Sequence, residues 1–406
     1  MEQNWAGNLT YRASRIARPG SVAELQQLVA ETPRIRALGS RHSFNELADT
    51  PEVLVSLDSL PAAISIADGQ VTVPAATRYG DLAAALQAEG LALPNLASLP
   101  HISVAGAVAT GTHGSGDGNG CLSTAVAALD VVGPTGELRR VARSDPEFDG
   151  HVVALGALGV VVSLTLDVLP TFEVRQTVYP RVPWSAVEDL DAVMSSAYSV
   201  SLFTDWTGEH LRQVWLKSTD SEPPADLHGA APSPVPVHMI PEESVAAVTE
   251  QLSVPGAWLD RLPHFRMTHK PSSGDELQSE YLLPRDRAVE AIARIRAMGQ
   301  RIAPVLHVTE IRSVAEDTLW LSGAYGRPAI AIHFTWHQKP AEVFALLPDI
   351  EAALLPLGAR PHWGKCFATT DLAGQYPKWT DFAELRSDLD PAGVFGNPFL
   401  ERLSLT

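Results

Sequence analysis

The spacing of hydrophobic and polar residues in the first third of the chain predicts a mixture of helices and strands. Residues 21–31 begin with a serine that can cap a helix and then place apolar side chains at helical intervals. Residues 34–38 and 52–57 are short apolar runs typical of strands. Two more strand-like runs flank Asp68-Gly69, a pair that favours a hairpin turn. These elements do not repeat as strand–helix–strand units, which indicates an α+β fold.

The pattern continues with another helix and changes near the middle of the chain. Residues 79–93 predict a helix, and residues 126–143 and 156–170 predict further strands. Long β-like runs follow, many with polar residues on one face, and a proline-rich stretch at 220–238 is expected to be a loop. A chain of 406 residues is too long for one ordinary core, so we predict two domains.

Composition narrows the class of protein. The net charge of −17 is unfavourable for binding nucleic acid or an anionic membrane, both of which need clustered Lys and Arg. The only cysteines, Cys121 and Cys366, form no disulfide framework or zinc pattern and fit a reducing cytosol. We see no signal peptide and no apolar run of about 18 residues that could span a membrane. The expectation is a soluble cytoplasmic protein that acts on small molecules.

Residues 95–120 are dense in Gly, Ala, Ser and Thr. Small residues let a backbone approach a ligand closely and leave N–H groups free to donate. The segment is not a Walker loop, because no Gly-Lys-Ser/Thr follows its glycines, and its GxGxG spacing does not match the dinucleotide fingerprint. Either a phosphate-bearing cofactor held by backbone N–H groups or a flexible surface loop fits this composition.

The segment RIRALGSRHSF (34–44) combines a strand with a turn that contains a histidine. Gly39 and Ser40 are typical of a turn that binds phosphate. A phosphate does not require His42, so this residue needs another explanation.

Three strand-like runs in the second half place polar residues on one face. Strand alternation puts Glu310 and Arg312 on the same face of one run. It puts His333, Thr335 and His337 on one face of the next. Such faces are either solvated or the lining of a site.

In the third run, residues 360–367, alternation puts Lys365 on the face of Trp363. If the three faces line one pocket, its carboxylate, guanidinium and ammonium groups nearly compensate each other. This mixture suits a neutral polyhydroxylated ligand better than an anion, for which several arginines are expected.

Two other chemistries are disfavoured. His333 and His337 can be drawn as a metal cluster with His307 and Glu310, but positions i and i+4 of a strand lie about 13 Å apart. The HExxH motif is also missing, so we predict no metal site. The sequence lacks a GxSxG nucleophile elbow, which argues against a hydrolase.

Seven motifs, in order, resemble those of the alditol oxidases (xylitol or sorbitol oxidases), which are flavoproteins of the vanillyl-alcohol-oxidase type. The motifs are LGSRHSFNE, NLASLPHISVAGAVATGTHGSG, GALGVVVSLTLDV, TEIRSV, IHFTW, RPHWGKCF and LDPAGVFGNPF. Each is weak alone, but the ordered set covers nearly the whole chain. The aldonolactone oxidases are similar more distantly.

The resemblance implies a two-domain α+β fold of the vanillyl-alcohol-oxidase type. Residues 1–170, completed by residues 375–406, are expected to form the FAD-binding domain. Residues 171–374 are expected to form a substrate-binding cap domain that bears a large antiparallel sheet. The change of pattern near Pro170 agrees with this division.

The resemblance also implies which residues bind FAD. His42 is expected to be joined covalently to the 8α-methyl carbon of the flavin, which raises its reduction potential and prevents its loss. The pyrophosphate is expected near Gly39, Ser40, Arg41, Ser43 and Phe44. The FAD cleft is expected to be lined by Ser103, Gly106, Gly111, Thr112, His113 and Gly114. Gly159 and Val160 are expected near the adenosine or ribityl part, and Ala97 near the isoalloxazine.

The substrate residues implied by the resemblance are Ser98, Glu310, Arg312, His333, Thr335 and Lys365. Arg312 and Lys365 are expected to hold the terminal C1 hydroxyl, where their charges favour developing alkoxide. Glu310 is expected to bind hydroxyls and to orient Arg312. Hydride then passes to flavin N5, and dioxygen reoxidises the flavin to give hydrogen peroxide. The base is open between a water and a neutral lysine.

The function implied is oxidation of a polyol such as xylitol, sorbitol or glycerol to the aldose, by a protein expected to be a monomer. Two alternatives stay open. One is an aldonolactone oxidase or dehydrogenase on the same fold, and the other is a flavin-binding protein without turnover.

Overall fold

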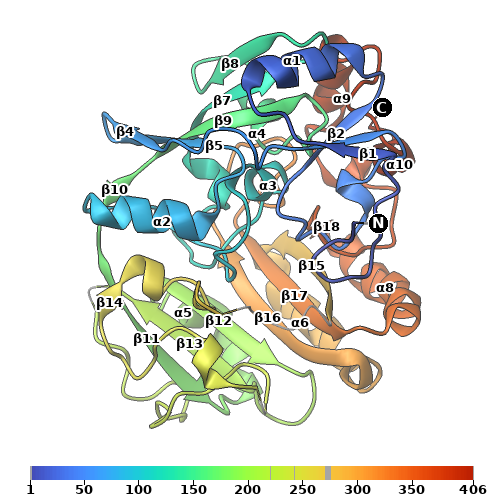
Figure 1. Cartoon of the computed structure of the whole chain (residues 1–406). Helices are drawn as coiled ribbons and strands as arrows, with labels where there is room; N and C mark the ends of the chain where they lie inside the picture. Colours follow the sequence, from blue (N-terminus) through green and yellow to red (C-terminus); the bar gives the residue numbers. More distant parts are fainter. Residues whose placement is uncertain (1, 220, 242, 270–275, 406) are drawn as a thin grey trace.

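Two antiparallel sheets dominate the structure and lie one above the other in Figure 1. The computed structural model describes residues 2–219, 221–241, 243–269 and 276–405. The smaller sheet has five strands in the order β4-β5-β9-β7-β8. Its strands are β4 (Ser65–Ala67), β5 (Gln70–Pro74), β7 (Val126–Val132), β8 (Leu138–Ala142) and β9 (Val160–Asp167).

The predicted hairpin joins β4 to β5. Asp68 has φ 53° and Gly69 has φ 73°, the left-handed pair that a two-residue turn between twisted strands requires. The predicted strands around residues 126–143 and 156–170 are also confirmed, as β7, β8 and β9. The α+β expectation is therefore confirmed for this part of the chain.

A small parallel sheet carries the turn that contains His42. Its strands are β1 (Arg15–Ala17), β3 (Val53–Ser56) and β2 (Ile35–Leu38), in that order across the sheet. Helix α1 (Val22–Glu31) begins where predicted, because the Ser21 hydroxyl accepts a hydrogen bond from the amide of Glu24 at 3.2 Å. The chain leaves β2 directly into the segment 39–44, so the sheet fixes where this segment starts.

The larger sheet has eight strands in the order β14-β11-β13-β12-β16-β17-β15-β18. All its neighbours pair antiparallel, and its strands all fall within residues 173–361. The strands are β11 (Glu173–Pro180), β12 (Ser199–Thr204), β13 (Gln213–Ser218), β14 (Gly256–Ala257), β15 (Glu276–Pro284), β16 (Leu306–Val314), β17 (Ala329–His337) and β18 (Arg360–Pro361). A further pair joins β6 (Leu91–Ala92) to β10 (Leu169–Pro170).

One face of the large sheet is apolar and covered by helices. Ile332, Phe334 and Trp336 of β17 lie in the same buried cluster as side chains of α6 and α8. This is the apolar face that strand alternation predicted, so the opposite, polar face is left to meet the rest of the chain. The α-helices are α1, α2 (Tyr79–Ala88), α3 (Val104–Ala109), α4 (Phe148–Val152), α5 (Leu190–Met194), α6 (Ala288–Ala297), α7 (Gly299–Ile302), α8 (Pro340–Leu354), α9 (Trp379–Leu389) and α10 (Pro398–Arg402).

The C-terminal segment folds back onto the N-terminal part, with both ends of the chain on the same side in Figure 1. The buried Arg36 guanidinium donates to the carbonyls of Leu47, Leu155 and Phe395, at 2.7 to 2.8 Å. The Asn397 amide donates to the carbonyls of Glu46, Leu47 and Asp49. These contacts close the loop that follows residues 39–44.

The prediction of a strand over residues 360–367 is wrong in extent. Strand β18 ends at Pro361, and the chain then turns at 363–365. Trp363 is buried with Tyr376 and Trp379, whereas Lys365 reaches toward β15. The two side chains therefore share no strand face.

None of the helices in the described part of the chain has the length and apolar character needed to cross a bilayer.

Candidate active site

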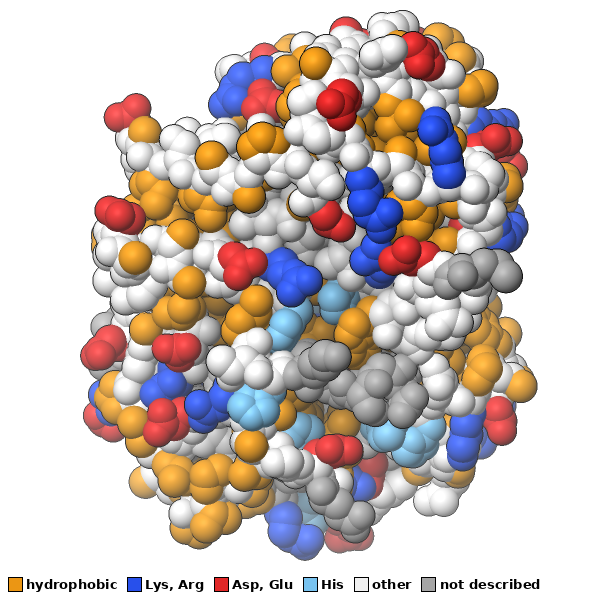
Figure 2. Space-filling model, viewed as in Figure 1, with side chains coloured by type: hydrophobic (Ala, Val, Ile, Leu, Met, Phe, Trp, Pro, Cys, Tyr) orange, Lys and Arg blue, Asp and Glu red, His pale blue; other side chains and the backbone are white. Residues whose placement is uncertain are grey.

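A cavity of about 950 Å³ lies between the polar face of the large sheet and the segments around β2 and α3. This volume is near the upper end of the range of about 300–1,000 Å³ for small-molecule sites. Figure 2 shows histidine side chains gathered near the middle of the face viewed, where the surface is hollowed. The residues predicted to bind the cofactor and the substrate are therefore expected to line this cavity.

The turn after β2 forms one wall of the cavity. Ser40 and Ser103 bond reciprocally: the Ser40 amide donates to the Ser103 hydroxyl at 3.3 Å, and the Ser103 amide donates to the Ser40 hydroxyl at 3.1 Å. A Cβ added at Gly39 would lie 2.9 Å from the Ser103 hydroxyl oxygen, so glycine permits this close approach. Arg41 has φ 65°, which turns the chain sharply toward His42.

His42 lines the cavity, and its imidazole is neutral near pH 7. Its ring stacks on Trp5 with centroids 5.3 Å apart. Burial lowers the pKa of His42 to about 4, so the ring is uncharged near pH 7. Its buried Nδ1 has no hydrogen-bond partner in the described residues. A buried nitrogen without a partner at a cavity wall is free to contact a molecule that binds in the cavity.

Most of the residues expected to bind the cofactor line this cavity. They are Gly39, Ser40, Arg41, His42, Ser43, Phe44, Ala97, Ser98, Ser103, Gly106, Thr112, His113 and Gly159. Three expected residues are not among its lining: Gly111, Gly114 and Val160. Gly114 packs against Asn95 and Leu96, and Val160 lies in the hydrophobic core while its neighbour Val161 reaches the cavity.

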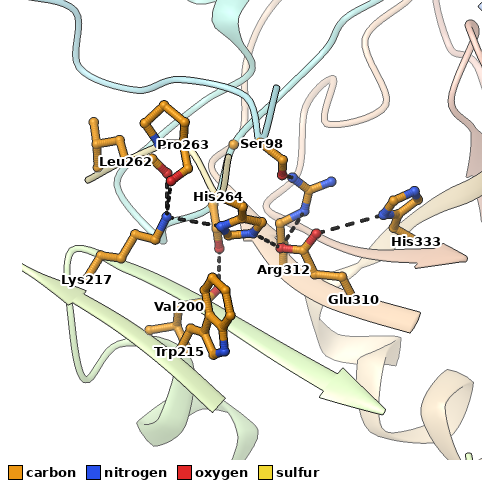
Figure 3. Close-up of polar contacts among 12 residues, drawn as sticks. Ser98, Val200, Trp215, Lys217, Leu262, Pro263, His264, Glu310, Arg312 and His333 are labelled. Atoms are coloured by element: carbon orange, nitrogen blue, oxygen red, sulfur yellow. Dashed lines mark hydrogen bonds and ion pairs between the residues drawn. The ribbon is translucent and has the colours of Figure 1, made fainter. Parts of the chain in front are cut away.

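The opposite wall is the polar face of strands β16 and β17. Glu310 and His333 are directly paired across these strands, and Glu310 Oε2 lies 3.8 Å from His333 Nδ1. Arg312 Nε lies 3.6 Å from Glu310 Oε1, and Arg312 also donates to the Ser98 hydroxyl at 3.4 Å (Figure 3). All six residues expected to bind substrate, including Thr335 and Lys365, line the cavity.

Sequence reasoning missed the residue at the centre of the charge cluster, Glu280. One Glu280 oxygen lies 2.9 Å from an Arg312 nitrogen, and the other lies 2.5 Å from Lys365 Nζ. His113 Nε2 is 3.3 Å away. The signal was present, because alternation along β15 also puts Glu276, Gln278 and Glu280 on one face, and all three line the cavity.

The charges in the cluster hold one another in the ionised form. Burial alone raises the pKa of Glu280, but Lys365, His113 and Arg312 more than offset this and hold the pKa well below its ordinary value. Burial also opposes ionisation of Glu310, yet Arg312 and His264 keep its pKa well below the ordinary value. The cavity therefore holds two carboxylates that stay ionised although they are buried.

The cations respond differently to burial. Burial lowers the pKa of Lys365 below its ordinary value, and the Glu280 carboxylate opposes this shift. The pKa of Arg312 is raised, because Glu310 and Glu280 outweigh its desolvation. Burial and the charge of Lys365 lower the pKa of His333 to about 4, so this imidazole is neutral near pH 7. Arg312 is therefore the fixed positive charge of the site.

The position of Lys365 is set by its backbone. The Asn45 amide donates to the carbonyls of Trp363 and Lys365, both at 2.8 Å. The Phe44 amide donates to the carbonyl of Gly364 at 2.8 Å. The segment that carries Lys365 is thus held by the same loop that carries His42, which brings both residues to one cavity.

No group of three or more metal-ligating side chains is arranged to hold an ion within the described ranges. The rings of His307 and His337 lie with their centroids 3.8 Å apart at an angle of 59°, while Glu310 pairs with His333 instead.

The residues of the first wall fit FAD, the cofactor that the resemblance implies. Gly39, Ser40, Ser103 and His42, whose buried Nδ1 is unpartnered in the described residues, all line one cavity. Backbone amides and small side chains are the groups that cradle a pyrophosphate. Residues 39–44 and 97–113 would therefore hold this cofactor.

Comparison with known proteins agrees with this fold and site. The family described as "FAD binding domain" matches residues 13–142, and that described as "D-arabinono-1,4-lactone oxidase" matches residues 274–403. The chain is 47% identical to an alditol oxidase of Streptomyces sp. (strain IKD472 / FERM P-14339), over 98% of each chain.

More distant similarity extends to lactone-oxidising proteins and to a solved structure. An L-gulono-1,4-lactone dehydrogenase of Mycobacterium tuberculosis is 29% identical over 98% of each chain. The crystal structure of cholesterol oxidase from B. sterolicum superposes with a TM-score of 0.80 at 16% identity, covering 99% of this chain and 96% of that one.

The fold and the cavity define an FAD-binding protein of the vanillyl-alcohol-oxidase type, in which a large antiparallel sheet faces the cofactor-binding segments. Within this class the similarity is strongest, among the proteins named above, to the alditol oxidase. The chain belongs to the alditol oxidase family.

Proposed function

We propose that this protein is an FAD-dependent alditol oxidase, which oxidises the terminal hydroxyl of polyols such as xylitol, sorbitol or glycerol to the aldose and reduces dioxygen to hydrogen peroxide. The observation that carries the proposal is the compensated charge cluster of Arg312, Lys365, Glu280 and Glu310 in the cavity that the FAD-binding segments also line. The similarity to an alditol oxidase along nearly the whole chain supports it.

The charge balance of the site favours a neutral substrate. Within the cluster two carboxylates, Glu280 and Glu310, lie beside two cations, Arg312 and Lys365, so the cluster itself offers no excess positive charge to an anion. The same groups offer many donors and acceptors within a buried space. A polyol matches this set, because each of its hydroxyls can donate one hydrogen bond and accept others.

Each residue then has a role in the reaction. Arg312 and Lys365 bind the terminal hydroxyl, and their positive charges stabilise the negative charge that grows on its oxygen as the proton leaves. Glu310, His333, Thr335 and Ser98 bind hydroxyls further along the substrate, which fixes the carbon to be oxidised. FAD, when bound, accepts the hydride from this carbon and passes the electrons to dioxygen.

A single anaerobic experiment tests this function. Purified protein is expected to have the absorbance of oxidised flavin, and xylitol is expected to bleach it without oxygen. Steady-state hydrogen peroxide production is then measured with xylitol, sorbitol, glycerol and gulonolactone. Activity on the lactone alone would favour the lactone oxidase, and a flavin that no polyol bleaches would indicate a protein without turnover.

The neutral His42 imidazole also supports a covalent bond between its ring and the flavin 8α-methyl carbon. An unprotonated nitrogen is the nucleophilic form of the ring, and the lowered pKa of about 4 keeps His42 in this form near pH 7. The Trp5 ring, stacked at 5.3 Å, limits its rotation.

His42→Ala is expected to abolish covalent attachment, because the variant lacks the imidazole nitrogen that would carry the bond. Acid-precipitated and washed wild-type protein should keep its yellow colour, and the variant should lose it. His101→Ala is the matched control, since His101 is a nearby half-buried histidine that does not line the cavity, and it should retain the colour. Colour lost from washed wild-type protein would contradict the covalent bond.

Three further features complete the proposal. Residues 1–170 with 375–406 form the FAD-binding domain, and residues 171–374 form the cap. The protein acts as a monomer in the cytoplasm, where its two cysteines, both buried and without a disulfide, stay reduced.

A further inference from the structure

A second chain of buried polar groups leads away from the cavity behind Glu310. His264 Nε2 lies 2.7 Å from Glu310 Oε1, and Lys217 Nζ lies 3.1 Å from His264 Nδ1 (Figure 3). Lys217, on β13, is 1% exposed, and His264 is 5% exposed. Neither residue belongs to the set that binds the terminal hydroxyl, so their burial beside Glu310 needs its own explanation.

The hydrogen bonds of Lys217 fix its role as a donor. Its Nζ also contacts the carbonyl oxygens of Leu262 at 2.5 Å and Pro263 at 3.1 Å. An ammonium has three N–H donors and no acceptor. Its three contacts here are two carbonyls and one imidazole nitrogen, so in the protonated form all three donors are used and His264 Nδ1 accepts.

This acceptance determines the tautomer of His264. In a neutral imidazole one ring nitrogen carries the hydrogen and the other accepts. Because Nδ1 accepts from Lys217, the hydrogen lies on Nε2 and is donated to the Glu310 carboxylate. In the other tautomer the lone pair of Nε2 would face the carboxylate oxygen 2.7 Å away, which is repulsive.

Burying the Lys217 ammonium and the His264 imidazole among aromatic side chains has a free-energy cost. The His264 ring packs edge-on against Trp215, with centroids 5.1 Å apart, and against Phe203, with centroids 5.7 Å apart. A buried ammonium is stable in such a place only when every N–H is bonded. The third N–H of Lys217 is donated to His264, and His264 in turn donates to the Glu310 carboxylate that lines the cavity.

We propose that Lys217 and His264 are positioning residues of the polyol site, in which Lys217 fixes the His264 tautomer that donates to Glu310 and keeps this carboxylate oriented toward the substrate hydroxyls. The inference rests on the proposed function, because it assigns Glu310 to a polyol. It adds a pair of residues that act through Glu310: His264 also lines the cavity, whereas Lys217 lies behind it.

The proposal predicts how substrate binding depends on pH. Burial lowers the pKa of Lys217 to about 7, and it lowers the pKa of His264 to about 4. The other charged or titratable groups around Glu310 are Arg312 on its own strand, His333 on β17, which is neutral in this range, and Lys365, whose pKa burial also lowers. As the pH rises through about 7, Lys217 loses its third N–H donor, and the hydrogen of His264 is no longer confined to Nε2. The Glu310 carboxylate then loses its fixed orientation, so KM for xylitol should rise.

Lys217→Met removes the donors and keeps the length of the side chain. We expect KM for xylitol to rise roughly tenfold or more, as for loss of a hydrogen bond to a charged group, while kcat changes less. Thr249→Val is the matched control. Thr249 donates to the same Pro263 carbonyl at 2.8 Å but does not contact the imidazole, so its loss should leave KM unchanged.

A double-mutant cycle distinguishes positioning of the His264 tautomer by Lys217 from simple support of the loop at Leu262 and Pro263. His264→Gln supplies an amide N–H to Glu310 that needs no tautomer. In this background Lys217→Met should change KM by less than about twofold, and the part of the rise of KM with pH that depends on Lys217 should disappear. An equally large effect of Lys217→Met in both backgrounds would overturn the proposal.

A measurement on the wild-type holoenzyme tests the tautomer without any loss of folding. The ¹⁵N shifts of labelled histidine, assigned to His264 by their absence in His264→Gln, should show an unprotonated Nδ1 and a protonated Nε2 at pH 6. A protonated Nδ1 would overturn the inference. If wild-type protein does not oxidise xylitol, the proposed function fails instead, and these shifts still report on Lys217 and His264.

Discussion

Lys365→Met is expected to lower kcat/KM for xylitol by about 10³-fold, the upper range for removing one group that stabilises a developing oxyanion. Methionine preserves the length of the side chain and removes the ammonium that lies 2.5 Å from Glu280. Arg312 then holds the terminal hydroxyl alone, without the second positive charge. Flavin should be retained, because Lys365 lies on the turn at 363–365 that the Asn45 amide holds through backbone carbonyls.

The measurement is steady-state peroxide production, with flavin content read from absorbance in the same samples. Lys378→Met is the matched control, because Lys378 pairs with Asp381 outside the cavity. It carries the same chemical change and should keep wild-type activity. Activity of Lys365→Met within threefold of wild type would remove this lysine from the reaction.

Glu280→Gln is expected to destabilise the protein by about 3–5 kcal/mol, the cost of breaking a buried ion pair from one side. The glutamine leaves Arg312 and Lys365 close together with the charge of only one nearby carboxylate, Glu310. The pKa of Lys365 should then fall further, because the group that opposes its desolvation is gone. Turnover should fall as well, since the pair that binds the hydroxyl loses its alignment.

Thermal unfolding with flavin bound measures the stability, and its pH dependence identifies the cause. The folded-state pKa of Glu280 lies below its ordinary value of about 4.3, so its contribution is present above that pH and is lost as the pH falls. Stability of the variant should therefore decline less steeply below pH 4 than that of wild type.

Glu351→Gln is the control for this change. Glu351 is also buried, but burial raises its pKa, and its partners are the Tyr281 hydroxyl and the Ala368 amide rather than cations. A neutral amide therefore changes little there. Equal stability losses in the two variants would show that Glu280 is no more than a buried polar residue.

Local signals in the sequence were sufficient for many individual elements. The serine before α1 and the Asp68-Gly69 turn are read from a few neighbouring residues, because caps and hairpins depend on short-range geometry. Alternation also identified the polar faces of β16 and β17. It failed at Lys365, because a strand of two residues followed by a turn does not keep the period of two.

The parts that could not be predicted depend on contacts between distant segments. Glu280 belongs to the site because β15 pairs with β17, and β17 with β16, an order that no local pattern specifies. Lys217 and His264 are separated by 47 positions. The first reads as one polar residue in a strand and the second as a loop histidine, so neither gives a signal alone.

The return of the C-terminal segment to Arg36 has a consequence for biosynthesis. Arg36 and its acceptor Phe395 are 359 positions apart, and the Asn397 amide that caps the loop around Glu46 and Asp49 is comparably distant. While the large sheet is still being synthesised, the turn with His42 therefore exists without these partners. Closure of the loop around Glu46 and Asp49 by the C-terminal segment then comes at the end of synthesis, so this wall of the cavity is among the last parts of the protein to be completed.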